Sequence, residues 1–314
     1  MHPCHMTPDA LLEWRPPHPT NLRETIGGLR RGPSDPTQRE APARAGERAA
    51  IWRTLRAPEG TASIRVAELD DGSLRCEGWG EGAAVAVAAA PELLGARDDA
   101  RAFEPHLEGV RVTHRRHPGM RIPRTGYVFD ALVPAILEQK VIVGQAQDAW
   151  RRLVCAYGDE APGPVDARMR VAPAAATWQR LPSWAWHRAG VDPQRSRTIV
   201  RCAGRAAAID RLAALPSTEA RARLQSLPGI GVWTSAEVAQ RALGDPDAVS
   251  VGDYHLAKHI GYALRGRDMT DAEMLEALEP WAGQRYRAVK LILMSGPRRP
   301  RRGAKLAYVD HRGY

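Results

Sequence analysis

The chain has 314 residues and a mass of 34.4 kDa, a length that suggests about two domains, each with a core of its own. Its formal net charge of +9 and sequence pI of about 9.8 favour an anionic partner. No apolar run is long enough to cross a bilayer, and the first residues lack the pattern of an export signal, so we expect no membrane partner and a cytoplasmic protein. The four cysteines, Cys4, Cys76, Cys155 and Cys202, lack metal-ligand spacing, which favours free thiols.

The first third of the chain predicts a small antiparallel sheet. Residues 1–50 show no sustained apolar period and are expected to be loop or irregular edge, with residues 1–13 as a flexible N-terminus. Short alternating runs then follow: IWRTLRA, SIRVAEL, LRCEGWG and AAVAVAAA. Asp71-Gly72, between two of these runs, is a hairpin signal. Residues 14–110 are therefore predicted to form an N-terminal α+β domain.

Residues 111–297 predict a helical core. Two apolar stripes at helical spacing run through residues 129–137 and 146–154, with a break near residues 139–144 and a stop at Gly158. Prolines divide residues 159–215 into short helices.

A last helical pair covers residues 274–294, interrupted by Pro280 and Gly283, and a basic tail follows at 298–314. A solvated end and an added contact with phosphate both remain open for this tail, whose basic residues are Arg298, Arg299, Arg301, Arg302 and Lys305.

Residues 217–244 predict a helix-hairpin-helix. Ala220, Leu224 and Leu227 recur at helical spacing, and the glycines and proline of the segment LPGIG (227–231) end that helix. Apolar residues then repeat until Gly244. The two hairpin glycines, Gly229 and Gly231, leave backbone N–H groups uncovered beside a helix N-terminus, an arrangement suited to a phosphate. An ordinary helical corner is the alternative.

Three segments together resemble the helix-hairpin-helix DNA glycosylase superfamily: LPGIG (227–231), WTSAEVAQRALGD (233–245) and VGDYHL (251–256). A looser similarity of the first third of the chain points to the branch of the bacterial 3-methyladenine DNA glycosylase II. The resemblance implies a mostly α fold, with a core of two helical subdomains preceded by a small antiparallel α+β domain. It also implies a monomer that binds double-stranded DNA containing damaged bases.

The resemblance implies a role for each matching residue. Asp253 stands where the family has its catalytic acid, and Trp233 and Glu237 fall at base-pocket positions. The DNA backbone would be bound around Leu227, Gly229, Gly231 and Thr234. A wedge inserted into the base stack would come from the turn after residue 138, where Gln139, Lys140 and Val141 are all candidates and a solvated helix end is the alternative.

The type of mechanism follows from one position. Relatives that also cut the strand carry a lysine two residues past the second hairpin glycine, whereas this chain has Trp233 there. Without an amine at that position no Schiff base forms through it, so a monofunctional enzyme without lyase activity is expected. No cysteine follows Cys202, so the iron–sulfur cluster of some relatives cannot form. We expect no cofactor, with a monovalent cation at the hairpin as an open possibility.

The expected reaction is hydrolysis of the N-glycosidic bond of a flipped, alkylated purine of the 3-methyladenine type, which leaves an abasic site. Three alternatives stay open from the sequence. The same fold can act on another lesion, such as uracil, hypoxanthine or a bulky adduct. A helix-hairpin-helix protein can also bind DNA without catalysis, or serve as an accessory protein of chromatin.

Overall fold

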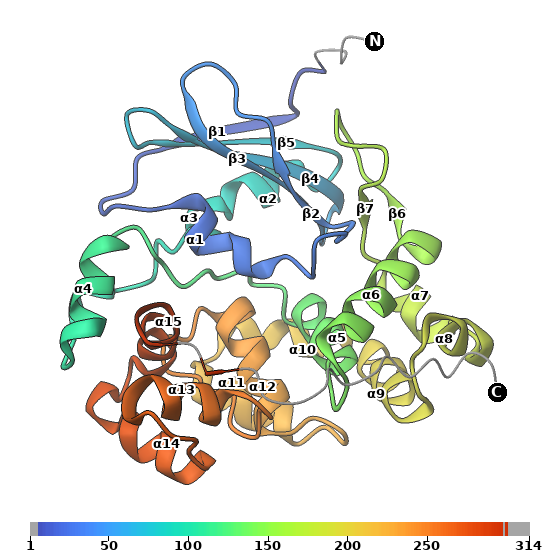
Figure 1. Cartoon of the computed structure of the whole chain (residues 1–314). Coiled ribbons are helices and arrows are strands. Elements are labelled where there is room, and N and C mark those ends of the chain that lie inside the picture. Colours follow the sequence, from blue (N-terminus) through green and yellow to red (C-terminus); the bar gives the residue numbers. More distant parts are fainter. Residues whose placement is uncertain (1–5, 298, 301–314) are drawn as a thin grey trace.

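The computed structural model describes residues 6–297 and 299–300, and it places a sheet above a larger body of helices (Figure 1). Five antiparallel strands form the sheet in the order β1-β5-β4-β3-β2. Their bounds are β1 (Ala10–Trp14), β2 (Gln38–Ala41), β3 (Glu47–Ala57), β4 (Gly60–Leu69) and β5 (Leu74–Trp79). The predicted hairpin is confirmed between β4 and β5, where Gly72 has a φ of 82° that an L side chain rarely adopts.

Short helices bury the inner face of this sheet. Helix α1 (Leu22–Ile26), the 3-10 turn η1 (Gly27–Leu29) and helices α2 (Ala83–Ala88) and α3 (Ala90–Leu93) contribute to one apolar cluster with β3, β4 and β5. The prediction of an extended AAVAVAAA run was wrong. Alanine favours the helix, and Ala83, Ala86, Val87 and Ala90 are buried at helical spacing.

The N-terminal segment is more ordered than its composition predicted. Strand β1 begins at Ala10, inside the range expected to be flexible, because its backbone pairs with β5. The loop between η1 and β2 is organised around Asp35, which is 1% exposed. Its carboxylate accepts hydrogen bonds from the Arg31 and Thr37 backbone N–H groups and from Trp150 Nε1. Hydrogen bonds to a buried carboxylate order this loop, and the spacing of apolar residues in a sequence gives no sign of such bonds.

The helical body contains two further apolar clusters. The helices of the larger cluster are α5 (Val128–Leu137), α6 (Val143–Tyr157), α7 (Ala175–Arg180), α8 (Ser183–Ala189), α9 (Pro193–Ala203), α10 (Ala206–Asp210), η3 (Arg211–Ala214), α11 (Ser217–Gln225), α12 (Val232–Val238) and the π-helical turn η4 (Ala239–Leu243). Two short strands, β6 (Asp159–Glu160) and β7 (Arg170–Val171), pair beside them.

The smaller cluster joins residues 103–120, which follow the 3-10 turn η2 (Ala100–Ala102), to the last helices of the chain. Its elements are α4 (Glu108–Arg116), α13 (Leu256–Arg265), α14 (Asp271–Leu278), η5 (Glu279–Trp281) and α15 (Arg285–Ser295). Helix α4 packs against α15, and the two lie close together in Figure 1. The predicted fold class, a helical core of two parts preceded by an antiparallel sheet, is confirmed. The predicted domain limits stay a prediction, although α4 begins at Glu108, slightly before the expected boundary.

The two predicted helical stripes are also found. The buried residues of α6 are Ala146, Ala149, Trp150, Leu153 and Val154, as the spacing indicates. Helix α5 is buried on every side, because α9, α12 and α6 surround it. Gly158 ends α6 with extended rather than left-handed backbone.

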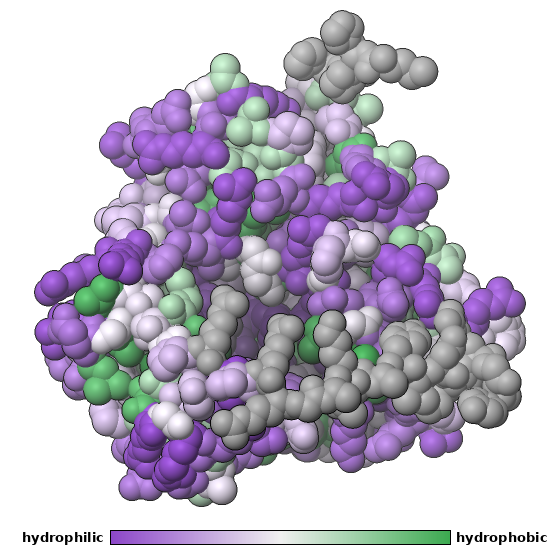
Figure 2. All heavy atoms as spheres, in the orientation of Figure 1, coloured by the Kyte–Doolittle hydropathy of each residue, from purple (hydrophilic) through white to green (hydrophobic). Residues whose placement is uncertain are grey.

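Hydrophilic residues cover most of the face in Figure 2, and apolar ones gather in small groups near α4 and α13. Among the described residues, no helix has the length and apolar character needed to cross a membrane. Of the predicted basic tail, Arg299 is described and forms an ion pair with Asp268 at 2.6 Å. Arg298, Arg301, Arg302 and Lys305 lie outside the described residues.

Candidate functional site

The predicted hairpin joins α11 to α12. Gly229 has a φ of 92°, and a Cβ there would meet the Thr198 side chain at 2.7 Å. Gly231 has a φ of −103° and a Cβ there would meet nothing within 4 Å, so only the first glycine needs its conformational freedom. Both glycines are exposed, and among the described contacts neither backbone N–H donates to another group. The hairpin therefore offers free donors at a helix N-terminus.

Gln139 ties the predicted wedge turn to the hairpin. Its Nε2 donates to the Gly229 carbonyl at 3.0 Å and to Thr234 Oγ1 at 2.9 Å. Thr234 is 2% exposed, and its hydroxyl is engaged by Gln139 inside the protein. Leu227 is partly buried against the larger helical cluster. Gln139 is thus a brace between two loops.

The same turn separates the other two wedge candidates. Lys140 is exposed and has a φ of 54°, the one left-handed residue with a Cβ among the described residues. Val141 is partly buried and packs against the core. Just before the turn, Glu138 pairs with Arg31 of the sheet domain at 3.0 Å. The turn is held by the hydrogen bonds of Gln139, the packing of Val141 and the Glu138–Arg31 ion pair, and the Lys140 side chain extends from it into solvent.

Asp253 occupies the loop before α13. Its Oδ1 accepts the backbone N–H groups of His255 at 2.8 Å and Leu256 at 2.9 Å, which caps that helix. Its Oδ2 accepts Trp233 Nε1 at 3.2 Å. The preceding Gly252 has a φ of 88°, and its N–H donates to Asp271. Capping and the indole N–H together hold a half-buried carboxylate in one orientation.

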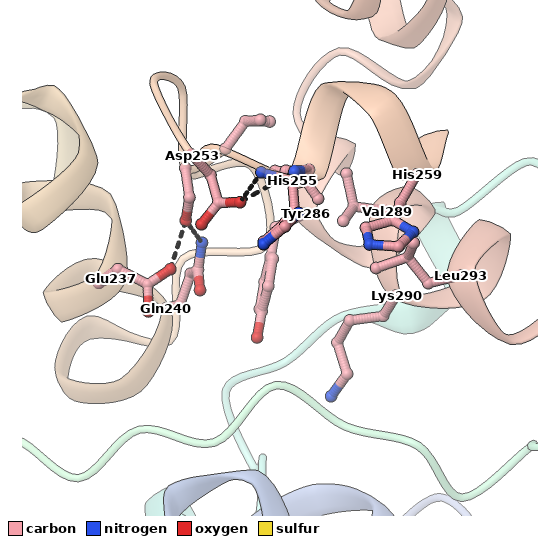
Figure 3. A pocket seen from close by; sticks show the side chains of 12 residues that line it. Glu237, Gln240, Asp253, His255, His259, Tyr286, Val289, Lys290 and Leu293 are labelled. Carbon is pink, nitrogen blue, oxygen red and sulfur yellow. Dashed lines mark hydrogen bonds between the residues drawn. The ribbon is translucent and has the colours of Figure 1, made fainter. Parts of the chain in front are cut away.

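Asp253 lines an open cavity of about 310 Å³ (Figure 3). The cavity lies between the helix-hairpin-helix, the Asp253 loop and α15, and its lining residues are Glu237, Gln240, Val249, Ser250, Asp253, His255, Leu256, His259, Tyr286, Val289, Lys290 and Leu293. Glu237, a predicted pocket residue, is among them. Trp233 is not, because its indole is directed to the carboxylate. The structure gives Trp233 a hydrogen bond that positions Asp253, and its role in the base pocket stays a prediction.

The charge of Glu237 is compensated within the protein. Its Oε2 pairs with Arg241 at 2.7 Å, one helical turn away, and its Oε1 accepts a hydrogen bond from Ser250. Gln240 donates to the same Ser250 hydroxyl at 2.9 Å. These contacts make one wall of the cavity polar and fix its side chains. The positive partner of Glu237 is the Arg241 guanidinium and not a lysine.

Helix α15 supplies a second wall that the sequence analysis did not identify. Tyr286, Val289, Lys290 and Leu293 lie on one helical face. Tyr286 gives this wall an aromatic ring. The i, i+4 spacing of Tyr286 and Lys290 was the available signal. Between them Arg287, fully buried, pairs with Asp98 and anchors the helix.

Two titratable groups on α15 have shifted pKa values. Burial, followed by the charge of Arg287, lowers the pKa of Lys290 from 10.5 to about 8. Burial also raises the pKa of the Tyr286 phenol. At neutral pH Tyr286 is therefore a neutral aromatic group with a hydroxyl donor, and Lys290 is mainly an ammonium ion.

No cluster of three or more metal-binding side chains occurs in the described part of the chain. At the hairpin, the Leu227 carbonyl accepts the Ile230 N–H at 3.0 Å, and the Gly229 carbonyl accepts Gln139. Each of these oxygens keeps one lone pair. A monovalent cation at the hairpin stays a prediction.

The comparisons with known proteins agree with this geometry. A probable bifunctional transcriptional activator/DNA repair enzyme AlkA of Mycobacterium tuberculosis is 33% identical over 186 residues, which cover 57% of this chain and 34% of that protein. Over those residues the chain is similar in sequence to a protein named as a DNA repair enzyme of the AlkA type. No family model matches, and the chain spans about a third of the length of the curated relatives it matches.

Solved structures show that the chain shares the fold of known DNA glycosylases. The 3-methyladenine DNA glycosylase of Archaeoglobus fulgidus has a TM-score of 0.71 and 18% identity, with 90% of this chain and 97% of that one covered. The Clostridium acetobutylicum 8-oxoguanine glycosylase/lyase, bound to double-stranded DNA, has a TM-score of 0.65 and 11% identity, with 92% and 98% covered. The shared fold thus includes a protein named as a lyase and one that is not.

Proposed function

We propose that the chain is a monofunctional DNA glycosylase that excises alkylated purines of the 3-methyladenine type. The observation that carries this proposal is the Asp253 carboxylate, oriented by two backbone N–H groups and the Trp233 indole at the wall of a cavity of about 310 Å³. That volume lies at the lower end of the range for small-molecule sites, about 300–1,000 Å³. The name of the AlkA relative and the resemblance of the site segments support the same reading.

The chemistry asks little beyond one carboxylate. The bond between the sugar C1′ and the base nitrogen breaks with its electron pair on the base, and positive charge develops on the sugar. Asp253 stabilises that charge and orients a water whose oxygen then bonds C1′, while the water's proton passes to the carboxylate or to solvent. A methylated purine is already cationic, so it departs as a neutral base without a second acid.

The partner in this proposal is double-stranded DNA containing a damaged base. Free N–H groups at Gly229 and Gly231 bind a backbone phosphate, and Lys140 enters the stack where the base leaves. The hydrogen bonds of Gln139 hold the Lys140 turn and the hairpin at a fixed separation. The protein acts as a monomer and needs no cofactor for hydrolysis.

The absence of strand cleavage follows from Trp233. The residue two positions past the second hairpin glycine points at Asp253 and carries an indole, which forms no Schiff base. Incubation with methylated DNA in the presence of borohydride tests this point. We expect free base and no trapped protein–DNA adduct, and an adduct would refute the monofunctional assignment.

The whole proposal is tested by incubating the protein with methylated duplex DNA. We expect free methylated purines and strand breaks that appear only after alkali treatment. Asp253→Asn should retain DNA binding and lose base release. DNA binding with no release of any base by the parent protein would favour the non-catalytic DNA-binding alternative.

A further inference from the structure

Lys290 is a half-buried ammonium ion that lines the cavity and has no ion-pair partner among the described residues. Glu237, across the cavity, is already paired with Arg241 and bonded to Ser250. The Lys290 Nζ lies 5.9 Å from the centroid of the Tyr286 ring, and the charges of Arg287 and Asp98 also act on it. An ammonium group has three donors and no acceptor, so a ligand acceptor that enters the cavity can bond to it in place of water.

The position of Lys290 determines which part of a base it faces. Figure 3 shows its ammonium on the other side of the Tyr286 side chain from Asp253. In a flipped purine the sugar bond lies at N9 and must sit beside Asp253. The edge that carries the C6 substituent is the edge farthest from N9. A base that fills the cavity therefore turns its C6 edge away from Asp253, toward the side where Lys290 stands.

We propose that Lys290 is a specificity-determining residue that donates a hydrogen bond to the 6-oxo oxygen of the flipped purine, so that the pocket prefers 6-oxopurine lesions to 6-aminopurine lesions. This inference rests on the proposed function. An oxo group at C6 accepts from the ammonium, whereas the amino group of an adenine lesion presents donors to a donor. The bond is charge-assisted, which makes it stronger than a neutral one.

A phosphate contact is the competing role for this lysine. The cavity favours the base, because the ammonium is recessed beside Tyr286 and Val289, whereas Lys140 and the hairpin amides are exposed. A phosphate contact would strengthen binding to any duplex. A base contact changes only the discrimination between lesions.

The test uses two lesions present in one sample of methylated DNA, 3-methylguanine and 3-methyladenine. Both are cations with the methyl group at the same position, and they differ at C6 and C2. Single-turnover release of both bases is measured together for the parent, Lys290→Met and Lys258→Met. Methionine keeps the aliphatic stem and removes the ammonium. Lys258 does not line the cavity and lies over the Tyr254 ring at 3.8 Å, which makes it the matched control.

We expect Lys290→Met to lower the ratio of 3-methylguanine to 3-methyladenine release by about tenfold or more, as loss of a hydrogen bond to a charged group implies. Lys258→Met should keep the parent ratio, and all three proteins should bind an undamaged duplex equally. An unchanged ratio with Lys290→Met, or a loss of undamaged-duplex affinity with equal loss on both bases, would overturn the inference while the glycosylase assignment stands. A parent protein that releases neither base would overturn both.

Discussion

The indole Nε1 of Trp233 donates to Oδ2 of Asp253 at 3.2 Å and so joins the start of α12 to the loop before α13. The other carboxylate oxygen accepts two backbone N–H groups of that loop. Because each oxygen has its own donors, the carboxylate cannot rotate without losing hydrogen bonds. The capping interaction that would explain Asp253 as a structural residue is also the interaction that aims its second oxygen.

Asp253→Asn separates these two roles. The asparagine carbonyl can still accept the N–H groups of His255 and Leu256, whereas its NH2 group cannot accept from Trp233, so we expect the melting temperature to fall by no more than a few degrees. The negative charge opposite the developing cation is lost, and the single-turnover rate of base release should fall about a hundredfold or more. A folded variant that releases 3-methyladenine at close to the parent rate would show that the acid is misassigned.

Trp233→Phe tests the positioning of that carboxylate. The ring is kept and the indole N–H is removed, which leaves Oδ2 without its described donor. A hydrogen bond to a charged group contributes about 1.5–3 kcal/mol, so we expect a loss of about tenfold or more in the chemical step. Affinity for an undamaged duplex should not change. Weaker binding of undamaged DNA at an unchanged rate would contradict the positioning role.

Gly229→Ala and Gly231→Ala should have different effects. Alanine at 229 needs left-handed backbone and collides with Thr198, so the melting temperature should fall by the equivalent of about 1 kcal/mol or more. Alanine at 231 meets no atom within 4 Å, so stability should be kept. Its methyl group would face an approaching phosphate, and the dissociation constant for any duplex should rise. Unaltered binding by the stable Gly231→Ala protein would exclude the hairpin as the DNA contact.

Lys140→Gly distinguishes a wedge from a solvated turn. The left-handed φ of 54° costs a residue with a Cβ about 1 kcal/mol, so glycine should leave the melting temperature equal or higher. Removing the side chain should slow excision from a fully paired duplex more than from a duplex with the lesion in a mismatch, where the base leaves the stack more readily. Equal effects on the two duplexes would argue against insertion into the stack.

The lesion preference should depend on pH. With a pKa of about 8, Lys290 is an ammonium at pH 7 and largely a neutral amine at pH 9.5. The charge-assisted bond weakens as pH rises, so the ratio of 3-methylguanine to 3-methyladenine release should fall between these values. Other ionisable groups around the ammonium are Glu237, Asp253, His255, His259, Tyr286, Arg287, Arg241, Asp98 and Glu24. Lys290→Met should show a flat ratio after subtraction of protein-free base loss, and a parallel decline in this variant would assign the effect to another group.

Local patterns in the sequence were enough to predict several features of the fold. These features are the hairpin at Asp71-Gly72, the apolar stripe of α6 and the helix-hairpin-helix ending at Gly244. They depend on turn-forming residues and on 3.6-residue periodicity, both of which can be read from one sequence. The same methods misread residues 83–90, because alternating valine and alanine fits both a strand and a buried helix. Burial of Ala83, Ala86 and Ala90 at helical spacing decided between them.

The partners of the site residues could be known only from the folded chain. Gln139 meets Gly229 and Thr234 across 90 and 95 positions of sequence, and Trp233 meets Asp253 across 20, distances over which residue type does not specify contact. The cavity is assembled from α12, the Asp253 loop and α15, whose common packing sets the separation of their side chains. Lys290 acquires its lowered pKa and its unpaired ammonium from that packing, since burial and neighbouring charges exist only once the chain is folded.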